Sequence, residues 1–200
     1  MAVKTTPRER FDEGYFRRHY EDHKTRVTTA DKTSELVRAV VGLARYWDAP
    51  LETALDLGAG VGHWKRALAR HAPKLAYRGV DVSAYACATY GHEQADISRF
   101  VTDETYDLVI CQGVLQYLDD AQAARTLANL GAMCGGLLYL EALTKRDVEE
   151  VIDADRTDTA VHVRAGTFYR RALARDFVTV GAGLFAAKRS GLLLFELERA

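Results

Sequence analysis

A glycine-rich loop between an apolar run and a helical pattern is the feature that most constrains this chain. Thr53–Leu57 has the composition of a buried strand and is followed directly by Gly58, Gly60 and Gly62. Helical spacing begins at Trp64 and ends before Pro73. Because glycines carry no side chain, a ligand can approach the backbone there and meet the free N–H groups of the helix start. The loop therefore predicts a ligand-binding strand–turn–helix unit of an α/β protein.

The residues around the loop exclude two common nucleotide motifs. A dinucleotide fingerprint needs a glycine where His63 stands, and a Walker A loop needs a Gly-Lys-Ser/Thr ending that is absent here. Asp56 lies two residues before Gly58, and a carboxylate there disfavours a pyrophosphate. It suits a ligand that carries an ammonium group.

The rest of the chain alternates apolar runs with helical patterns, which is typical of βαβ units. Further strands are predicted at 76–82, 94–97, 106–111, 137–143, 177–188 and 192–198, the last two joined by a tight turn at Ser190-Gly191. Helices are predicted at 8–22, 31–47, 64–71, 83–90, 119–133 and 167–175. We expect a single α/β domain over residues 1–200, with N-terminal helices in 1–50 and a core in 51–200. Its sheet should be a Rossmann-like, doubly wound, mixed sheet of seven strands.

Composition bounds the partners of the chain. Lys and Arg total 27 and Asp and Glu total 28, so the net charge of −1 argues against a main role in gripping nucleic acid. Three cysteines without a CxxC pair predict neither a disulfide framework nor a cysteine metal site, and they favour a reducing cytoplasm. The charged N-terminus and the short apolar runs predict no membrane association.

Two further carboxylates follow the glycine loop at the ends of predicted strands. Asp81 lies 23 residues after Gly58, where a carboxylate can accept both hydroxyls of a ribose. Asp96 ends the third predicted strand, where it can accept from an exocyclic adenine amine while Ile97 packs on the ring. Together with Asp56, these residues predict a ligand with an amine, a ribose diol and an adenine, and no phosphate.

This set of motifs resembles the class I S-adenosylmethionine-dependent methyltransferases of small-molecule type. The matching segments are 56–62, Asp81, 95–97 and 106–115. The resemblance implies S-adenosylmethionine as cofactor and methyl transfer to a small molecule by in-line displacement. It also implies a set of cofactor-binding residues, of which Cys111 and Gln112 would border the sulfonium: Asp56, Gly58, Ala59, Gly60, Gly62, Asp81, Val82, Asp96, Ile97, Cys111 and Gln112. Only 15 residues separate Asp81 from Asp96, so the second helix of the core should be short.

No catalytic residue is fixed by the sequence, because methyl transfer depends mainly on positioning and needs a base only for acceptors such as alcohols. Tyr117 stands where similar enzymes often carry a histidine, and it either packs or hydrogen-bonds a substrate. The chain lacks the Asn-Pro-Pro-Tyr type of motif after the fourth strand, which disfavours nucleobase or glutamine methylation. The candidates for a direct role are Tyr15, His19, Tyr20 and His162.

The aromatic segment 11–23 has two interpretations. It is either an amphipathic helix that packs on the sheet or a lid over the cofactor, and Gly14 favours a mobile element. Two other functions remain open: an RNA or protein methyltransferase, suggested by the arginines of 164–175, and a non-catalytic partner subunit. The sequence leaves the acceptor, the methylated atom and the oligomeric state open.

Overall fold

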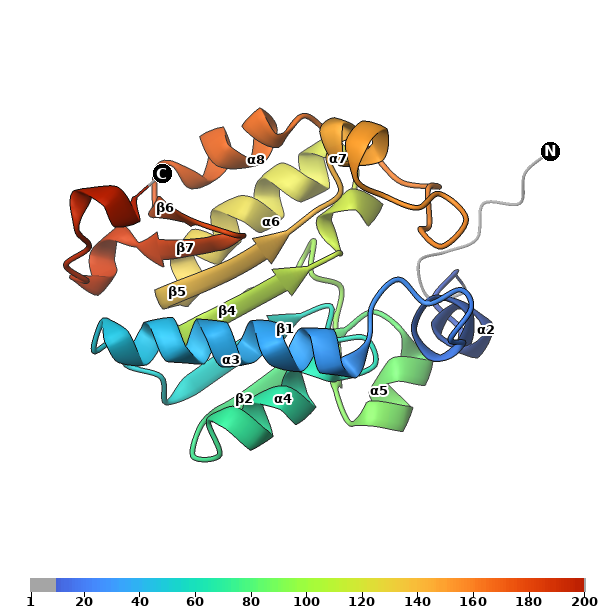
Figure 1. Cartoon of the computed structure of the whole chain (residues 1–200), viewed down its shortest axis with the longest axis horizontal. Helices are drawn as coiled ribbons and strands as arrows, with labels where there is room; N and C mark the ends of the chain where they lie inside the picture. The colour runs from blue at the N-terminus through green and yellow to red at the C-terminus, as the bar shows by residue number, and fades with distance from the viewer. Residues whose placement is uncertain (1–9, 200) are drawn as a thin grey trace.

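The computed structural model describes residues 10–199, and its centre is a seven-stranded sheet with the order β3-β2-β1-β4-β5-β7-β6 (Figure 1). The strands are β1 (Thr53–Leu57), β2 (Ala76–Asp81), β3 (Glu93–Gln94), β4 (Tyr106–Gln112), β5 (Cys134–Glu141), β6 (Phe177–Gly181) and β7 (Leu184–Ala187). β1 to β5 are parallel, and β7 lies antiparallel between β5 and β6. The prediction of a mixed, doubly wound seven-stranded sheet is confirmed.

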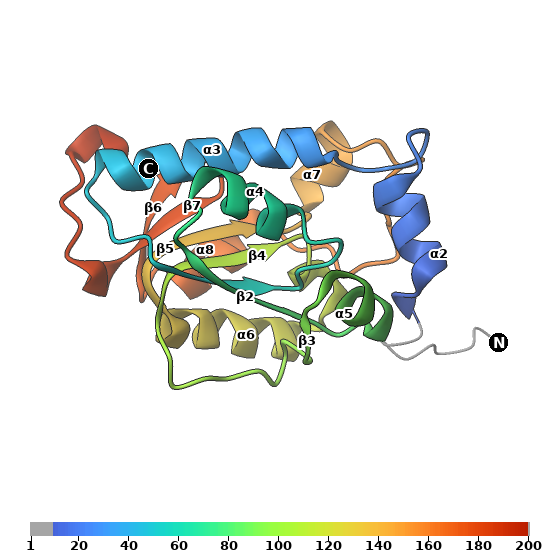
Figure 2. The same cartoon turned by 90° about the horizontal axis from the view of Figure 1, so that it is seen from below.

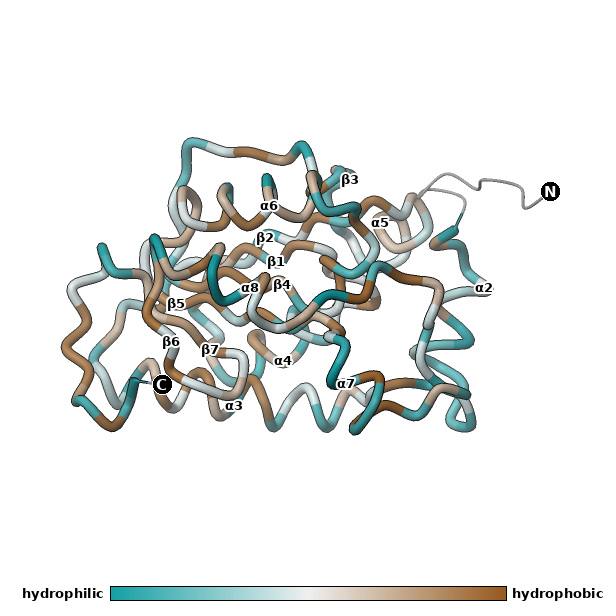
Figure 3. Tube along the Cα trace, turned by 90° about the horizontal axis from the view of Figure 1, so that it is seen from above, coloured by the Kyte–Doolittle hydropathy of each residue, from teal (hydrophilic) through white to brown (hydrophobic). Residues whose placement is uncertain are grey.

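Helices cover both faces of the sheet (Figure 2). On one face lie α3 (Ala30–Tyr46) and α4 (His63–His71), and on the other lie α6 (Asp120–Met133) and α8 (Gly166–Leu173). The alternation of strand side chains divides the core accordingly: Leu108 and Ile110 pack with α3 and α4, whereas Val109 and Cys111 pack with α6 and α8. In Figure 3 hydrophobic residues follow the central strands, and hydrophilic residues lie mostly on the outer turns.

The remaining elements gather mainly at the carboxyl ends of the parallel strands. They are α2 (Glu13–Phe16), the π-helical η1 (Arg17–Glu21), α5 (Ala84–Tyr90), η2 (Leu115–Tyr117) and α7 (Lys145–Glu150), while the short turns η3 (Lys188–Ser190) and η4 (Glu196–Glu198) close the chain elsewhere. Figure 1 places α2 and α7 beyond the arrowheads of β4 and β5. This is the edge where ligands bind in open α/β sheets.

The N-terminal helix is shorter than the prediction. The Asp12 carboxylate caps α2 by accepting the backbone N–H of Tyr15 at 2.8 Å, so the helix begins at Glu13. The predicted start at residue 8 lies outside the described residues. Helix α7 was not predicted; Thr144 and Asp147 form a capping box that starts it within the polar stretch 144–166.

The second helix of the core is short, as predicted, but the third strand is shorter than expected. Ser83 caps α5 by accepting the N–H of Ala86, and the helix ends after seven residues. β3 contains only Glu93 and Gln94, because the chain turns at Asp96, whose side chain accepts the N–H of Ser98 at 2.9 Å.

The predicted hairpin around Ser190-Gly191 is wrong. The turn lies at Ala182-Gly183, where φ values of 49° and 79° match the type I′ geometry that suits two-residue hairpins. Residues 192–198 form no strand; Leu192 and Leu194 pack against the α3 side of the core, and Leu193 and Leu197 are exposed. Residues 192–195 form an apolar run, but no strand lies beside it to complete a ladder.

Arg164 is buried and lines neither of the two cavities beside the glycine loop, so it does not support the RNA or protein acceptor suggested by the arginines of 164–175. Its side chain is 6% exposed and donates to Asp120 at 2.7 Å and to the carbonyl oxygens of Leu115 and Leu118. The guanidinium therefore ties the end of the 144–166 segment to η2. The other arginines of this set, Arg170, Arg171 and Arg175, are exposed.

Cys87, Cys111 and Cys134 are free thiols. Within residues 10–199, no helix has the length and apolar character needed to cross a bilayer. In the same part of the chain, no three His, Cys, Asp or Glu side chains are grouped closely enough to hold a metal ion.

We predict that Arg164→Ala lowers the free energy of unfolding by about 2–4 kcal/mol, because two carbonyl oxygens lose a charged donor inside the protein. Urea denaturation measures this change. The matched control is Arg170→Ala on the exposed face of α8, which should change stability by no more than ~0.5 kcal/mol. Equal urea midpoints for the two variants would contradict the structural role of Arg164.

Candidate functional site

The glycine loop is held in place by the end of β2. The Val80 carbonyl accepts the N–H groups of Gly58 and Ala59 at 2.8 and 3.0 Å, and the Asp81 carboxylate accepts the N–H of Gly60 at 2.8 Å. The other oxygen of Asp81 accepts the N–H of Ser83 at 2.8 Å. Burial raises the pKa of Asp81, whereas these backbone donors lower it. Each carboxylate oxygen keeps a further lone pair for a ligand.

Glycine is required at position 58 for two reasons. Its φ of 81° is a left-handed conformation, and an added Cβ would collide with the Val114 side chain. Gly62 also has a positive φ, but it is the N-cap of α4 and lines no cavity. Its left-handed conformation turns the chain from the loop into α4.

Two adjoining cavities open beside the loop, with volumes of about 750 Å³ and about 270 Å³. The residues that line both cavities form a boundary between them: Tyr15, Tyr20, Gly58, Gly60, Gln112, Gly113 and Tyr117. A molecule that fills the small cavity can thus reach the large one past Gln112.

The small cavity brings together the carboxylates that were predicted for the ribose and the adenine. Asp81, Val82, Asp96 and Ile97 all line it. Its apolar wall adds Phe11, Phe16, Val114 and Leu118. Acceptor oxygens thus stand beside an apolar slot of the kind that takes a flat ring.

Asp56 lies at the base of the large cavity and is buried. Tyr77 donates its hydroxyl to the Asp56 carboxylate at 2.7 Å. Burial, reinforced by the nearby Asp81, raises the pKa of Asp56 to about 7, although the Tyr77 bond acts in the opposite direction. The carboxyl group therefore titrates near neutral pH.

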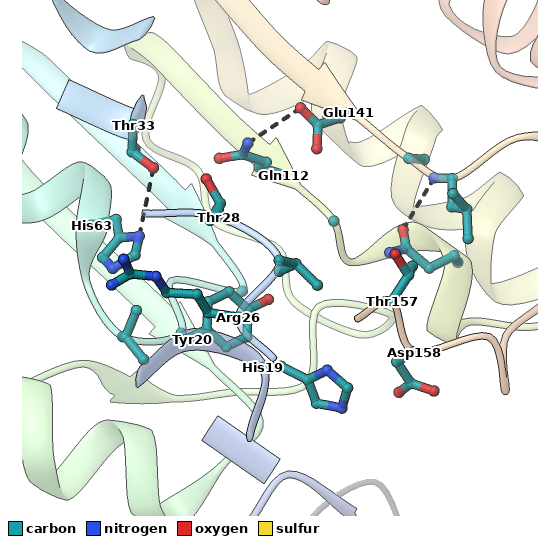
Figure 4. A pocket seen from close by; sticks show the side chains of 18 of the residues that line it. His19, Tyr20, Arg26, Thr28, Thr33, His63, Gln112, Glu141, Thr157 and Asp158 are labelled. Atoms are coloured by element: carbon teal, nitrogen blue, oxygen red, sulfur yellow. Dashed lines mark hydrogen bonds between the residues drawn. The ribbon is translucent and has the colours of Figure 1, made fainter. Parts of the chain in front are cut away.

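A chain of hydrogen bonds fixes the wall of the large cavity at the ends of β4 and β5, and Figure 4 shows its link between Gln112 and Glu141. Trp64 donates its ring N–H to Gln112 Oε1 at 2.7 Å, so Gln112 turns its amide nitrogen toward Glu141 Oε2 at 3.2 Å. Tyr139 donates its hydroxyl to the same Glu141 oxygen at 2.9 Å. Glu141 Oε1 has no hydrogen-bond partner among the described residues.

Aromatic side chains from the N-terminal segment close the boundary between the cavities. The hydroxyls of Tyr15 and Tyr117 lie 2.7 Å apart, Phe11 packs edge-on against both rings, and His19 lies against Tyr15. Burial raises the pKa values of Tyr15, Tyr20 and Tyr117, so these phenols stay neutral. They can donate and accept hydrogen bonds but are not bases.

Polar and basic side chains line the loop side of the large cavity. Arg26, Thr28 and Lys32 lie there, and Figure 4 shows Arg26 beside His63 and Tyr20. Burial and the charge of Arg66 lower the pKa of His63 to about 4, so this histidine is neutral.

The structure brings most of the predicted residues to the cavities but not all. Cys111 is fully buried against α6 and lines neither cavity, because adjacent strand residues face opposite sides of the sheet. Burial also raises the pKa of its thiol to about 12. His162 is exposed and lines neither cavity, so its position does not support a role as a base. Tyr15, His19 and Tyr20 do line the large cavity.

Sequence reasoning missed several contributors to the site. Tyr77 and Trp64 orient Asp56 and Gln112, and Asp158 reaches the large cavity from the segment after α7. These contacts join residues far apart in the chain. The alternation of side chains along β2 places Tyr77 on one face of the sheet, but no residue near it in the sequence indicates that it donates to Asp56.

The comparisons with known proteins follow this geometry. Residues 55–136 match the family model described as a methyltransferase domain. The chain has the α/β Rossmann-like fold of the class I methyltransferases. A search of curated proteins with the sequence finds no match.

Solved methyltransferases share the fold of this domain. Magnesium protoporphyrin IX methyltransferase from Synechocystis PCC 6803 with bound SAM aligns with a TM-score of 0.62 at 21% identity, covering 90% of this chain and 93% of that one. The sugar N-methyltransferase KedS8 from Streptoalloteichus sp ATCC 53650 aligns with a TM-score of 0.61 at 18% identity, covering 84% and 91%. An O-methyltransferase family protein from Burkholderia thailandensis has a TM-score of 0.59 at 15% identity, and the alignment covers 81% of this chain but only 59% of that protein.

We predict a pH-dependent difference in stability between the wild type and Asp56→Asn. The folded-state pKa of Asp56 is about 7 against an ordinary value of 3.8, so folding favours the protonated form. That stability is complete below pH 4 and is lost as pH rises toward 7. From pH 5 to 7.5 the wild type should lose about 2–3 kcal/mol relative to the variant, at roughly 1.4 kcal/mol per pKa unit.

Urea unfolding of both proteins at the two pH values measures this difference. Asn keeps an oxygen that can accept from Tyr77, so the comparison isolates the titration. Parallel pH dependence of the two proteins would refute a raised pKa at this site.

Proposed function

We propose that this chain transfers the methyl group of S-adenosylmethionine to a small-molecule acceptor by in-line displacement. The observation that carries the proposal is the small cavity, which is lined by Asp81, Asp96 and Ile97. This cavity adjoins the large cavity at Gln112. Two carboxylates suit a ribose diol and an adenine amine, and they disfavour a phosphate.

The described residues fit the rest of that cofactor. Asp56 and the backbone of Gly58, Ala59 and Gly60 would face its amino-acid end, where Asp56 can pair with the ammonium group. Arg26 and Lys32 line the same side of the large cavity and can pair with the carboxylate. Gln112 borders both cavities and would lie nearest the sulfonium.

When bound, the cofactor supplies an activated methyl group, and the protein supplies orientation and exclusion of water. The neutral phenols of Tyr15, Tyr20 and Tyr117 surround the boundary where that methyl group would emerge. His19 remains the one candidate base of the four considered, because its Nδ1 lies 3.3 Å from the Arg156 carbonyl. A carbonyl oxygen only accepts, so this contact fits a ring that donates from Nδ1, and the neutral form of that tautomer has Nε2 free to accept a proton.

Two observations support a small molecule as the acceptor. Structural neighbours include enzymes named for a porphyrin and for a sugar. The arginines that suggested an RNA or protein acceptor give no support, since Arg164 is buried and α8 lies on the sheet rather than at the cavity mouth. The three free thiols favour a cytoplasmic location.

We also infer that residues 10–29 form a lid within a single domain. Arg10 pairs with Asp158 at 2.8 Å, and Tyr90 donates to Glu21 at 2.9 Å, so the segment is attached on both sides of the cavity mouth. It also supplies Tyr15 and Tyr20 to the boundary. Opening of these contacts would widen the mouth through which a ligand enters and leaves.

We predict that S-adenosylhomocysteine binds this protein with a dissociation constant of about 1–100 µM, measured by isothermal titration. Asp81→Ala should weaken binding by about 100-fold or more, because the ligand loses charge-assisted hydrogen bonds and the loop loses its anchor. Asp103→Ala, an exposed carboxylate outside both cavities, is the matched control and should bind like the wild type. No heat of binding with the wild type would end the proposal.

We predict that Tyr15→Phe accelerates the dissociation of S-adenosylhomocysteine by about 5-fold, since the lid loses one hydrogen bond of roughly 1 kcal/mol. Stopped-flow fluorescence can follow release, because Trp64 lines the large cavity. Tyr46→Phe removes a hydroxyl from a side chain that is 68% exposed on α3, and its release rate should match the wild type. An unchanged rate in Tyr15→Phe would argue against the lid.

A further inference from the structure

The large cavity divides into two halves of different chemistry. The half beside the glycine loop contains Asp56 with the basic Arg26 and Lys32. The other half is formed by the end of β5 and the segment after it, with the carboxylates of Glu141, Asp147, Asp153 and Asp158. If the cofactor binds as proposed, its amino-acid end takes the first half and leaves the second for the acceptor.

The positive charges of the second half are already paired. Arg156 lies 3.3 Å from Asp153, and Arg10, which reaches in from the small cavity, lies 2.8 Å from Asp158. Asp147 accepts the N–H and hydroxyl of Thr144 in the cap of α7. Glu141 and Asp147 each keep one carboxylate oxygen, Oε1 and Oδ1, without a partner among the described residues, and of the two only Glu141 is bonded to Gln112.

Glu141 is also the best oriented of these groups. Tyr139 and Gln112 both donate to its Oε2, and Gln112 is itself held by Trp64, so the free Oε1 has a fixed position. Gln112 borders both cavities, which places Glu141 next to the boundary where the methyl group would emerge (Figure 4). Apolar contact in this half comes from Leu143, Val151 and Ile152.

We propose that the acceptor is a small molecule with an aliphatic amine, and that Glu141 Oε1 accepts a hydrogen bond from its nitrogen. This inference rests on the proposed function. An anionic acceptor would meet uncompensated carboxylates, whereas an amine gains a charge-assisted partner and an apolar wall for its carbon skeleton.

The transfer balances without a further reactant. The ammonium form of the acceptor first gives a proton to water. The nitrogen lone pair then forms the new bond to the methyl carbon, while the carbon–sulfur bond breaks and its electron pair stays on sulfur. The methylated product is an ammonium, as the acceptor was, so one proton in all is released, in the first step. An alcohol acceptor would instead need a base during attack.

Binding to the protein saturated with S-adenosylhomocysteine tests the inference separately from turnover. The probes are cyclohexylamine, cyclohexanol and cyclohexanecarboxylate, which share one skeleton, titrated at low ionic strength by ligand-observed NMR. We expect the amine to bind at least about 10-fold more tightly than the other two. Radiolabelled methyl transfer from S-adenosylmethionine should likewise occur to the amine and not to the alcohol.

Glu141→Gln should weaken binding of the amine by about 10-fold and leave that of the alcohol and of S-adenosylhomocysteine within about 2-fold. Glu149→Gln, an exposed carboxylate on α7 outside the cavities, is the matched control and should change neither. Equal or tighter binding of the alcohol or the carboxylate, no binding of the amine, or no effect of Glu141→Gln would overturn the inference. Failure of S-adenosylhomocysteine to bind would instead overturn the proposed function.

Discussion

The attachment of the glycine loop to the end of β2 is the contact on which the site depends. Val80 and Asp81 together accept three consecutive N–H groups of the loop, from Gly58 to Gly60, and Asp81 also holds the start of α5. The Asp81 carboxylate thus positions both the glycine loop and the start of α5. These two contacts also fix the orientation of the carboxylate, and therefore the direction of the lone pairs that remain free for a ligand. The proposed ribose site and the loop that faces the amino-acid end of the cofactor are therefore built as one unit, and a change at Asp81 affects both.

The second organising feature is the layer of aromatic and polar side chains that the N-terminal segment and the 144–166 segment add to the sheet. Neither segment belongs to the central sheet, yet together they enclose the cavities. Tyr15 meets Tyr117, and Arg10 meets Asp158 across the mouth. Arg164 fixes the end of the second segment by binding the carbonyls of η2. The shape of the large cavity thus depends on contacts between residues more than 40 positions apart in the sequence.

Local patterns predicted the elements that carry most of the proposed cofactor site. β1 and β4 follow from apolar runs, α4 from helical spacing, and the start of α5 from the capping chemistry of Ser83. The same local reasoning failed where the neighbouring residues fit a strand as well as a loop, or an exposed side chain as well as a buried one. Residues 192–198 begin with an apolar run like that of a strand, but the segment pairs with no strand of the sheet. Arg164 is one arginine among several in the sequence, and only folding buries it.

The sequence by itself determined the sheet class, the glycine loop and the carboxylates Asp56, Asp81 and Asp96, because each depends on spacing along one strand–turn–helix unit. The tertiary structure alone decided that Cys111 faces the core, that Asp56 titrates near neutral pH beneath Tyr77, and that Glu141 stands oriented beside Gln112. Desolvation and hydrogen-bond orientation arise from side chains that distant segments contribute. Those properties are fixed only when the segments pack together.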